Sequence, residues 1–251
     1  MPSLGEHDLA GAAWPDVLAD PLVLLPVGST EQHGPHLPLS TDTVIAQAVA
    51  ERAAGILRGR TAGQVLVAPA MPYGASGEHA GFPGTISIGH AALYAVIVET
   101  VRSLALWAGR VVLVNGHGGN VRTLDAAVGR LRAEGHEAAW IGCEAPGGDA
   151  HAGVTETSVM LYLAPHLVQP FGEVEGDTRP LAEIMPDLVA KGVRAVSPSG
   201  VLGDPAGSSA ERGRAIVAAM ASTVAARIGG GRVEESGRLI DPGVASPGPP
   251  P

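Results

Sequence analysis

The chain has 251 residues, of which 45% are hydrophobic and 3% aromatic, and its formal net charge is -9 at pH 7. The 16 Lys and Arg residues are scattered and form no basic stripe, which argues against a nucleic-acid partner. The first residues are acidic where a signal peptide needs a basic region, and the apolar runs end well before membrane-spanning length. We therefore expect a soluble, cytoplasmic protein with no membrane partner.

Short apolar runs alternate with helical patterns along most of the chain. Continuous apolar segments predict buried strands at residues 22–27, 65–68, 111–114 and 137–142. Helical spacing predicts helices at residues 42–57, 90–108, 121–135, from about 155, and from 209 to 228, the first capped by Thr41 or Asp42 and the last by Ser208 with Glu211. Alternating strands and helices predict an α/β protein of three layers, α/β/α, with a mostly parallel central sheet.

Two regions near the C-terminus have weaker signals. Residues 170–190 have little periodicity, and residues 193–205 (VRAVSPSGVLGDP) have the pattern of a strand and a turn. The chain ends in SPGPPP, so we expect a single domain over residues 1–235 and a Pro/Gly-rich disordered tail over 236–251.

The stretch PVGSTEQHGPHLPLSTDT, residues 26–43, follows the first predicted strand and is dense in metal-type ligands. Glu31 and His33 stand two residues apart, so in an extended segment both side chains project to one side. Asp42 lies at the start of a helix, where an ionised carboxylate is favoured and can bridge two ions. His117 follows another buried strand and is flanked by glycines. Such ligand sets hold Zn, Mn or Fe(II).

Each of these residues also has an ordinary interpretation, because a single loop histidine or carboxylate usually lies on the surface. A shared location favours a functional site. The loops rich in His, Asp and Glu follow Val27, Val114 and Gly142, and the carboxyl ends of parallel strands meet at one edge of the sheet. For His36 and His79 a role in shaping the pocket or binding substrate is favoured over metal ligation.

The motif NGHGGN, residues 115–120, admits a competing interpretation as the oxyanion loop of an α/β-hydrolase. That fold needs a G-x-S-x-G nucleophile elbow, which the chain lacks, and no glycine loop carries the G-K-[ST] of a P-loop. A serine nucleophile and nucleotide binding are therefore excluded.

Five segments in this order resemble the creatininase family of metal-dependent amidohydrolases: GSTEQHGPHLPLSTD, YGASGEHAGFPGTISIG, VVLVNGHGGN, DAHAGVTETS and GVLGDP. The resemblance covers roughly residues 22–230. It implies the three-layer fold, two divalent metal ions per subunit, hydrolysis of a carbon–nitrogen amide bond, and a homo-oligomer, typically a hexamer.

The resemblance also implies roles for individual residues. Glu31, His33, Asp42 and His117 fall on metal-ligand positions, with Asp42 as the bridge. His151 falls on a position that assists proton transfer. The residues expected to contact substrate are His36, Ser76, Glu78, His79 and Asn120.

The sequence departs from the creatinine-hydrolysing members at Gly119, where those members have a glutamate that completes the metal shell. Glu156 is the nearest carboxylate in the sequence after the HAG motif, and we expect it to replace the missing ligand and to share the proton transfer with His151. Residues 145–149 contain none of the tryptophans that close over creatinine in those members.

The best overall match is the mycofactocin-system branch of the family, whose members are peptidases that release the C-terminal, modified dipeptide from a small ribosomally made precursor peptide. We therefore expect a small precursor peptide as substrate. The alternatives are a small-molecule amide hydrolase of the same family, such as a formamide deformylase or a creatinine-type lactam hydrolase, and a non-catalytic assembly subunit.

Overall fold

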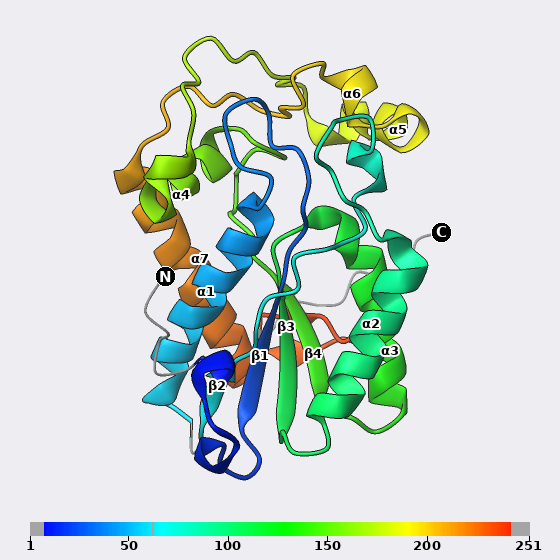
Figure 1. Cartoon of the computed structure of the whole chain (residues 1–251), viewed down its shortest axis with the longest axis vertical. Coiled ribbons are helices and arrows are strands. Elements are labelled where there is room, and N and C mark those ends of the chain that lie inside the picture. Colours follow the sequence, from blue (N-terminus) through cyan, green and yellow to red (C-terminus); the bar gives the residue numbers. More distant parts are fainter. Residues whose placement is uncertain (1–7, 62, 242–251) are drawn as a thin grey trace.

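The computed structural model describes residues 8–61 and 63–241, and at its centre lies a four-stranded parallel sheet in the order β2-β1-β3-β4 (Figure 1). The strands are β1 (Leu22–Val27), β2 (Val65–Val67), β3 (Arg110–Asn115) and β4 (Ala138–Gly142). Their register places Leu24 of β1 between Val67 of β2 and Val112 of β3.

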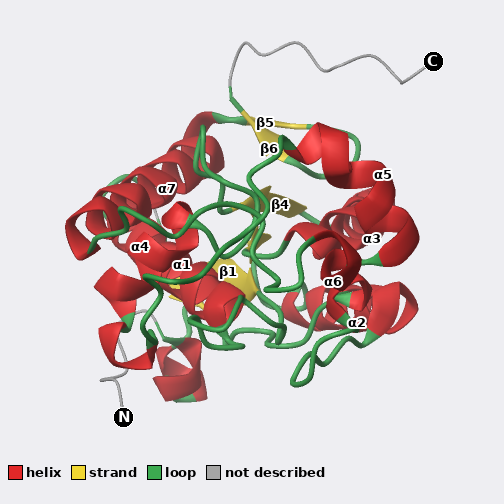
Figure 2. Ribbon diagram, turned by 90° about the horizontal axis from the view of Figure 1, so that it is seen from above, coloured by secondary structure: helices red, strands yellow, loops and turns green. Residues whose placement is uncertain are grey.

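Helices cover both faces of this sheet, which confirms the predicted α/β/α layers. On one face lie α1 (Thr41–Arg58), α4 (Val154–Leu163) and α7 (Ala210–Gly230), and on the other α2 (Gly89–Leu104) and α3 (Val121–Ala133) (Figures 1 and 2). None of the helices within the described residues combines the length and the apolar character that a membrane span requires.

The continuous apolar runs of the strands follow from this two-sided burial. Leu24 packs into the core beneath α1 and α7, whereas its neighbours Val23 and Leu25 pack into the core beneath α2 and α3. Successive side chains of a strand point to opposite faces, so a strand covered on both faces needs apolar residues at every position.

The prediction of a strand after residue 192 is wrong. Residues 170–190, which had little periodicity, contain α5 (Leu181–Lys191), and α6 (Val193–Val196) follows directly after Gly192, whose φ is 77°. The letters V-R-A-V fit one helical turn as well as a strand, because Val193 and Val196 stand three residues apart. Both valines pack in a small core with Ile184 and Leu188 of α5.

Two details at the C-terminal end also differ from the sequence prediction. The N-cap of α7 is Ser209, whose side chain accepts from the backbone N of Arg212 at 3.2 Å, while the Ser208 hydroxyl bonds to the carbonyl of Pro205 at 2.6 Å. Strands β5 (Arg232–Val233) and β6 (Leu239–Ile240) pair antiparallel, and Leu239 is fully buried. Ordered structure therefore continues past residue 235, and residues 242–251 of the predicted tail lie outside the described residues.

The loops that follow β1, β3 and β4 all leave the same edge of the sheet, at the top of Figure 1. Short 3₁₀ turns at Gly77–His79 and Gly118–Asn120, labelled η3 and η4, add two further polar segments. The fold therefore brings the predicted ligands together at the carboxyl ends of its parallel strands, where ligands bind in open α/β sheets.

Candidate metal centre

Asp42 lies at the middle of the site, in the first turn of α1. Its Oδ1 is 2.9 Å from Nε2 of His33 and its Oδ2 is 3.3 Å from Nδ1 of His117, so one oxygen faces each imidazole. The Ser29 hydroxyl donates to Oδ2 at 2.7 Å. Asp42 is therefore no cap for α1; the N-cap is Ser40, which makes no side-chain capping bond.

Glu31 supplies a second carboxylate, which is fully buried and has no hydrogen-bond partner on either oxygen. Its Oε1 lies 3.2 Å from Nδ1 of His117 and 3.3 Å from Nε2 of His79. A buried carboxylate without partners is costly unless a positive charge compensates it, so these residues fit a bound cation.

Three groups of side chains could each hold an ion. The atoms within each group lie within 4.8 Å of one another, and the groups are Glu31 with Asp42 and His117, His33 with His151 and Glu156, and Glu31 with His79 and His151. His117 of the first group faces Oδ2 of Asp42 and His33 of the second group faces Oδ1, as expected for two ions that share this carboxylate.

Backbone carbonyls fix the tautomers of three of these imidazoles. A carbonyl oxygen can only accept, so the ring nitrogen beside it carries the proton and the other nitrogen is free to face the carboxylates. Metal-binding histidines show the same arrangement. The pairs are Nδ1 of His33 with O of Glu31 (3.1 Å), Nε2 of His117 with O of Ala75 (3.2 Å), and Nε2 of His151 with O of Gln32 (2.9 Å).

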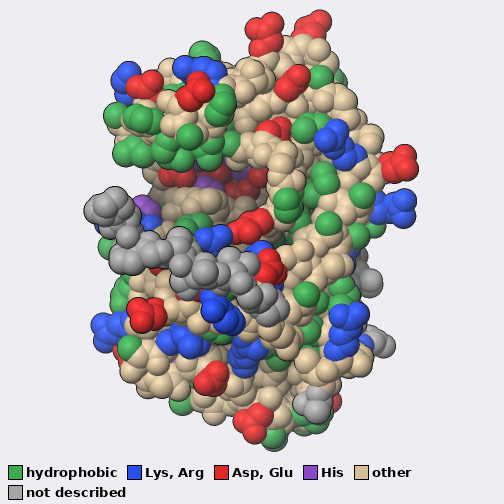
Figure 3. Space-filling model, turned by 180° about the vertical axis from the view of Figure 1, so that it is seen from behind, with side chains coloured by type: hydrophobic (Ala, Val, Ile, Leu, Met, Phe, Trp, Pro, Cys, Tyr) green, Lys and Arg blue, Asp and Glu red, His purple; other side chains and the backbone are tan. Residues whose placement is uncertain are grey.

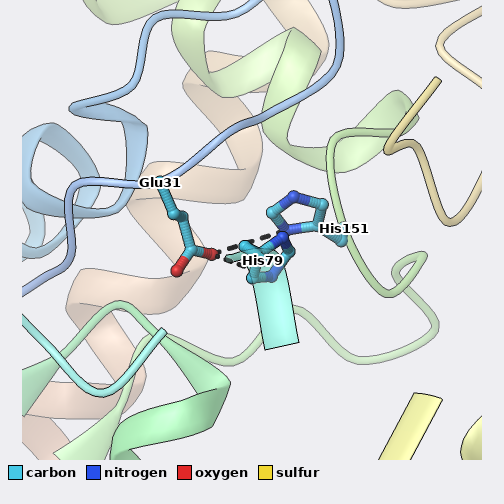
Figure 4. Close-up of side chains that lie close together, drawn as sticks. All are labelled: Glu31, His79 and His151. Carbon is cyan, nitrogen blue, oxygen red and sulfur yellow. Dashed lines mark ion pairs between the residues drawn. The ribbon is translucent and has the colours of Figure 1, made fainter. Parts of the chain in front are cut away.

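His79 has the opposite polarity, and Gln32 is the cause. The Gln32 amide is oriented by two backbone groups, because its Oε1 accepts from Gly34 N at 2.9 Å and its Nε2 donates to Gly200 O at 3.0 Å. The same Nε2 lies 2.8 Å from Nδ1 of His79, which must therefore accept. The His79 proton is then on Nε2, which lies 3.3 Å from Glu31 Oε1. Figure 4 shows this contact beside the one between Glu31 and His151.

The acidic groups and histidines of the centre shift one another's pKa values. Burial lowers the pKa of His33, but the carboxylate of Asp42 outweighs burial and raises it to about 10. Burial likewise opposes protonation of His117, but hydrogen bonds to carboxylates, first that of Asp42, raise its pKa. Burial raises the pKa of Asp42, and the charge of His33 overcomes this and lowers it. The carboxylates of the centre thus stabilise positive charge on the groups beside them.

Glu156 and His151 shift toward their neutral forms. Burial raises the pKa of Glu156 to about 7, although the charge of His33 opposes this rise. Its Oε2 accepts from the backbone N of Ala152 at 2.6 Å and lies 3.8 Å from Nε2 of His33. Burial lowers the pKa of His151, and the charge of His33 lowers it further.

Two cavities meet at the centre. The larger, about 780 Å³, is lined by Glu31, His79 and His117 at its inner end and by α5 and α6 at its outer end. The smaller, about 290 Å³, reaches Asp42 and Glu156 from the other side. Figure 3 shows acidic and histidine side chains at the bottom of a hollow with hydrophobic side chains on its rim.

The structure does not bring every predicted residue to these cavities. His36 is fully buried, bonds Thr157 Oγ1 at 2.8 Å and lines neither cavity. Asn120 is also fully buried, and its amide links three backbone or side-chain groups of neighbouring loops. Its contacts are Ala75 N (3.0 Å), Gly28 O (3.0 Å) and Asn115 Oδ1 (3.1 Å). Both side chains hold neighbouring loops together, and their expected contacts with substrate stay predictions.

Ser76, Glu78 and His79 lie around His117, with Ser76 Oγ and Glu78 Oε1 each 3.4 Å from its Nε2. Glu156 lies beside His33, and it is not among the atoms nearest to Gly119. Glu156 thus lies on the His33 side of the centre, where it could supply a carboxylate to an ion, and its replacement of the ligand missing at residue 119 stays a prediction.

Sequence reasoning missed Gln32 and Asp149. Gln32 stands between the predicted ligands Glu31 and His33, and this position was the available signal. Asp149 accepts from the backbone N of Thr155 at 3.0 Å and from that of Val154, which holds the start of α4 beside the centre. An aspartate shortly before a predicted helix is a capping signal.

Comparisons with known proteins identify relatives of this chain. The sequence pattern of the Creatininase family, described as creatinine amidohydrolase, matches residues 10–228. A mycofactocin precursor peptide peptidase of Mycolicibacterium smegmatis is 52% identical over 219 residues, 87% of this chain and 89% of that protein. A creatinine amidohydrolase of Pseudomonas putida is 34% identical over 181 residues, 59% of this chain and 66% of that protein.

Among solved structures, one titled "Creatininase Mn" superposes with a TM-score of 0.66 at 27% identity, covering 87% of this chain and 96% of that chain. A creatininase variant titled "Zn-Zn type" superposes with a TM-score of 0.64 at 26% identity, covering 87% and 95%. With the family pattern matched over most of its length, the chain belongs to the creatininase family.

Proposed function

We propose that this member of the creatininase family is a divalent-metal-dependent peptidase that hydrolyses an amide bond of a mycofactocin precursor peptide and releases its C-terminal, modified dipeptide. The 52% identity with a peptidase of that name, over 87% of this chain, supports the substrate. The observation that carries the proposal is the larger cavity, which joins the candidate metal centre to an apolar wall that reaches the surface.

That wall is formed by α5 and suits a peptide better than a small ring. Its residues Leu181, Met185 and Val189 are 42%, 41% and 81% exposed, so the cavity continues from the buried carboxylates to solvent. The segment 145–149 contains no aromatic residue that could close over a ring. A chain could therefore enter along α5 with its scissile carbonyl at the centre.

The donor set would hold two ions, with Glu31, Asp42 and His117 on one side and His33, Asp42 and Glu156 on the other. When bound, ions of the Zn, Mn or Fe(II) type supply Lewis acidity to the scissile carbonyl and lower the pKa of a water molecule.

Two side chains are placed to move protons during hydrolysis. His151 keeps its proton on Nε2, so its Nδ1 can accept a proton from the attacking water and pass it to the leaving nitrogen. Glu156, whose Oε2 accepts from the backbone N of Ala152, is the second candidate for proton transfer. His79 presents its Nε2–H to the same cavity and can donate to a substrate oxygen.

The main rivals are a small-amide hydrolase and a non-catalytic assembly subunit. The experiment is to incubate the metal-loaded protein in parallel with the modified precursor peptide, creatinine and a formamide, and to follow products by mass spectrometry. Release of a dipeptide from the peptide alone supports the proposal. Hydrolysis of creatinine or the formamide alone would overturn the substrate, and no turnover of any of the three would favour the assembly subunit.

The proposal also includes a cytoplasmic location and a homo-oligomer, with the hexamer that the family resemblance implies. Mass photometry of the purified protein measures the number of subunits directly, and a stable monomer would contradict this part.

A further inference from the structure

Gly119 has no room for a side chain. A Cβ at this position would lie 2.4 Å from Nε2 of His117 and 2.5 Å from both the Ala75 carbonyl oxygen and Oε1 of Glu78. Distances this short require a neighbour to move, and the backbone of Ala75 cannot do so cheaply. By contrast, a Cβ on the adjacent Gly118 would meet no atom within 4 Å.

The space beside Gly119 holds the Glu78 carboxylate, which comes from a different loop. Glu78 lies in the turn η3, whose ends are fixed by backbone bonds from His79 N to Ser76 O (3.0 Å) and from Ala80 N to Gly77 O (3.1 Å). Its Oε1 lies 3.4 Å from Nε2 of His117, and its side chain is 34% exposed. A carboxylate is thus present where a side chain at 119 would project, although the residue at 119 cannot supply it.

The two nitrogens of His117 face different groups. Nδ1 lies 3.2 Å from Glu31 Oε1 and 3.3 Å from Asp42 Oδ2, and Nε2 faces Glu78. An ion held by Nδ1 would lie across the ring from Glu78, so Glu78 in this position is not a ligand of that ion. It is instead the carboxylate that faces the Nε2 proton, beside the Ala75 carbonyl that Nε2 contacts at 3.2 Å.

We propose that Glu78 is a positioning residue for His117. Its carboxylate accepts the Nε2 proton, keeps Nδ1 turned toward Glu31 and Asp42, and makes Nδ1 a stronger metal ligand. Residue 119 is a glycine because this carboxylate and the Ala75 carbonyl fill the space that a side chain would need. A carboxylate, a histidine and a metal in this order form a recurrent arrangement in proteins. The inference rests on the metal centre of the proposed function and is independent of its peptide substrate.

Two uncharged acceptors also lie near the Nε2 proton of His117, and one of them provides a control for the charge of Glu78. The Ala75 carbonyl lies 3.2 Å and the Ser76 hydroxyl 3.4 Å from Nε2 of His117. Both can fix the tautomer, but only Glu78 adds a negative charge. Loss of charge at Glu78 should therefore weaken metal binding more than loss of the equally distant Ser76 hydroxyl.

The experiment measures zinc and manganese affinity by competition with a chelator, without peptide, for the full-length wild type and for Glu78→Gln, Glu78→Ala and Ser76→Ala. We expect the affinity to fall about 10- to 100-fold in Glu78→Ala, the range for such partners, less in Glu78→Gln, and less than about 3-fold in Ser76→Ala. The metal-free Tm of Glu78→Gln should match the wild type, so that a folding defect does not explain the loss.

The glycine provides a second, independent arm. Gly119→Ala should lower metal affinity, whereas the adjacent Gly118→Ala should not. Unchanged metal affinity in both Glu78 variants would overturn the inference and leave Glu78 as a substrate contact. A Glu78 variant that binds only one ion per subunit, even with excess metal, would also overturn the inference, because Glu78 would then be a metal ligand. If the wild-type protein binds metal with normal affinity but cleaves no peptide, only the proposed substrate is refuted.

Discussion

Two groups of charged side chains in this molecule have similar geometry and opposite surroundings. In the candidate metal centre, His33 Nε2 lies 2.9 Å from Asp42 Oδ1, and both side chains are almost fully buried. On the surface, Glu134 accepts from Arg102 and Arg130 at 2.7 Å. Judged by these distances alone, the surface ion pairs would be the stronger interactions. Burial must therefore decide whether each group stabilises the fold or binds a cation.

The two groups differ in whether water can replace the contacts between their charges. The arginines of the surface group are charged under all ordinary conditions and water can replace their contacts, so such pairs contribute little to stability. In the centre, Glu31, His33 and Asp42 are almost fully buried, Glu31 has no hydrogen-bond partner, and each charge depends on its neighbours. The buried group is therefore poor at stabilising the fold by itself and well suited to binding a cation.

The largest effect is expected for Asp42→Asn, which removes the carboxylate that faces both His33 and His117. We expect activity to fall by at least about 100-fold, the upper end of the range for outer partners of metal ligands, and metal content to fall on both sides of the centre. Metal analysis and peptide turnover measure this. Asp241→Asn, which removes an exposed partner of Arg227, is the matched control. Retention of two ions per subunit by Asp42→Asn would contradict the bridging role.

An intermediate effect is expected for Gln32→Met, which removes the amide that fixes the His79 tautomer. We expect activity to fall about 10-fold, the lower end of the same range, with metal content unchanged, because the ligand histidines are fixed by carbonyls. Imidazole ¹⁵N NMR reports the tautomer directly. Gln47→Met, which removes an exposed bond to Glu51, is the control. If His79 kept its proton on Nε2 in Gln32→Met, the role given to Gln32 would be wrong.

A smaller effect is expected at the exposed wall of α5. Val189→Asp places a charge on the apolar side of the larger cavity, and we expect KM for the peptide to rise about 3- to 10-fold through lost apolar contact, with kcat unchanged. Leu106→Asp, at a side chain that is 86% exposed and lines neither cavity of the centre, is the matched control. An equal change in both variants would show that α5 does not contact the peptide.

Sequence could predict the core because its physical rules are local. Strands covered on both faces need continuous apolar runs, and β1 and β3 end within one residue of the expected positions. The helix α5 had no such signal, because Pro186 lies inside it and most of its apolar side chains line an open cavity rather than a core.

The candidate site was predictable where chain direction alone brings residues together. Glu31, His33, Asp42 and His117 converge because their loops leave the same sheet edge. The sequence did not reveal that the Glu78 carboxylate lies beside Gly119, because tertiary packing brings its loop there. The role of the Gln32 amide depends on the distant backbone of Gly200, which its position between Glu31 and His33 does not reveal.

The smallest effect is expected for Glu134→Gln on the surface. Hydrogen bonds from Arg102 and then Arg130 lower the pKa of Glu134 from its ordinary value of 4.5 to about 2. Because the folded-state pKa is lower, the ionised form stabilises the fold above the unfolded pKa, and this contribution is lost as pH falls toward 2.

The wild type should therefore unfold at a slightly higher Tm than Glu134→Gln near pH 6, and the two Tm values should converge as pH falls toward 2. Peptide turnover should be the same in both, because this group lies outside both cavities of the centre. Thermal unfolding at several pH values tests this. A difference as large as that of a buried substitution would mean that exposure does not separate the two charged groups, since water could then not replace the arginine contacts of Glu134.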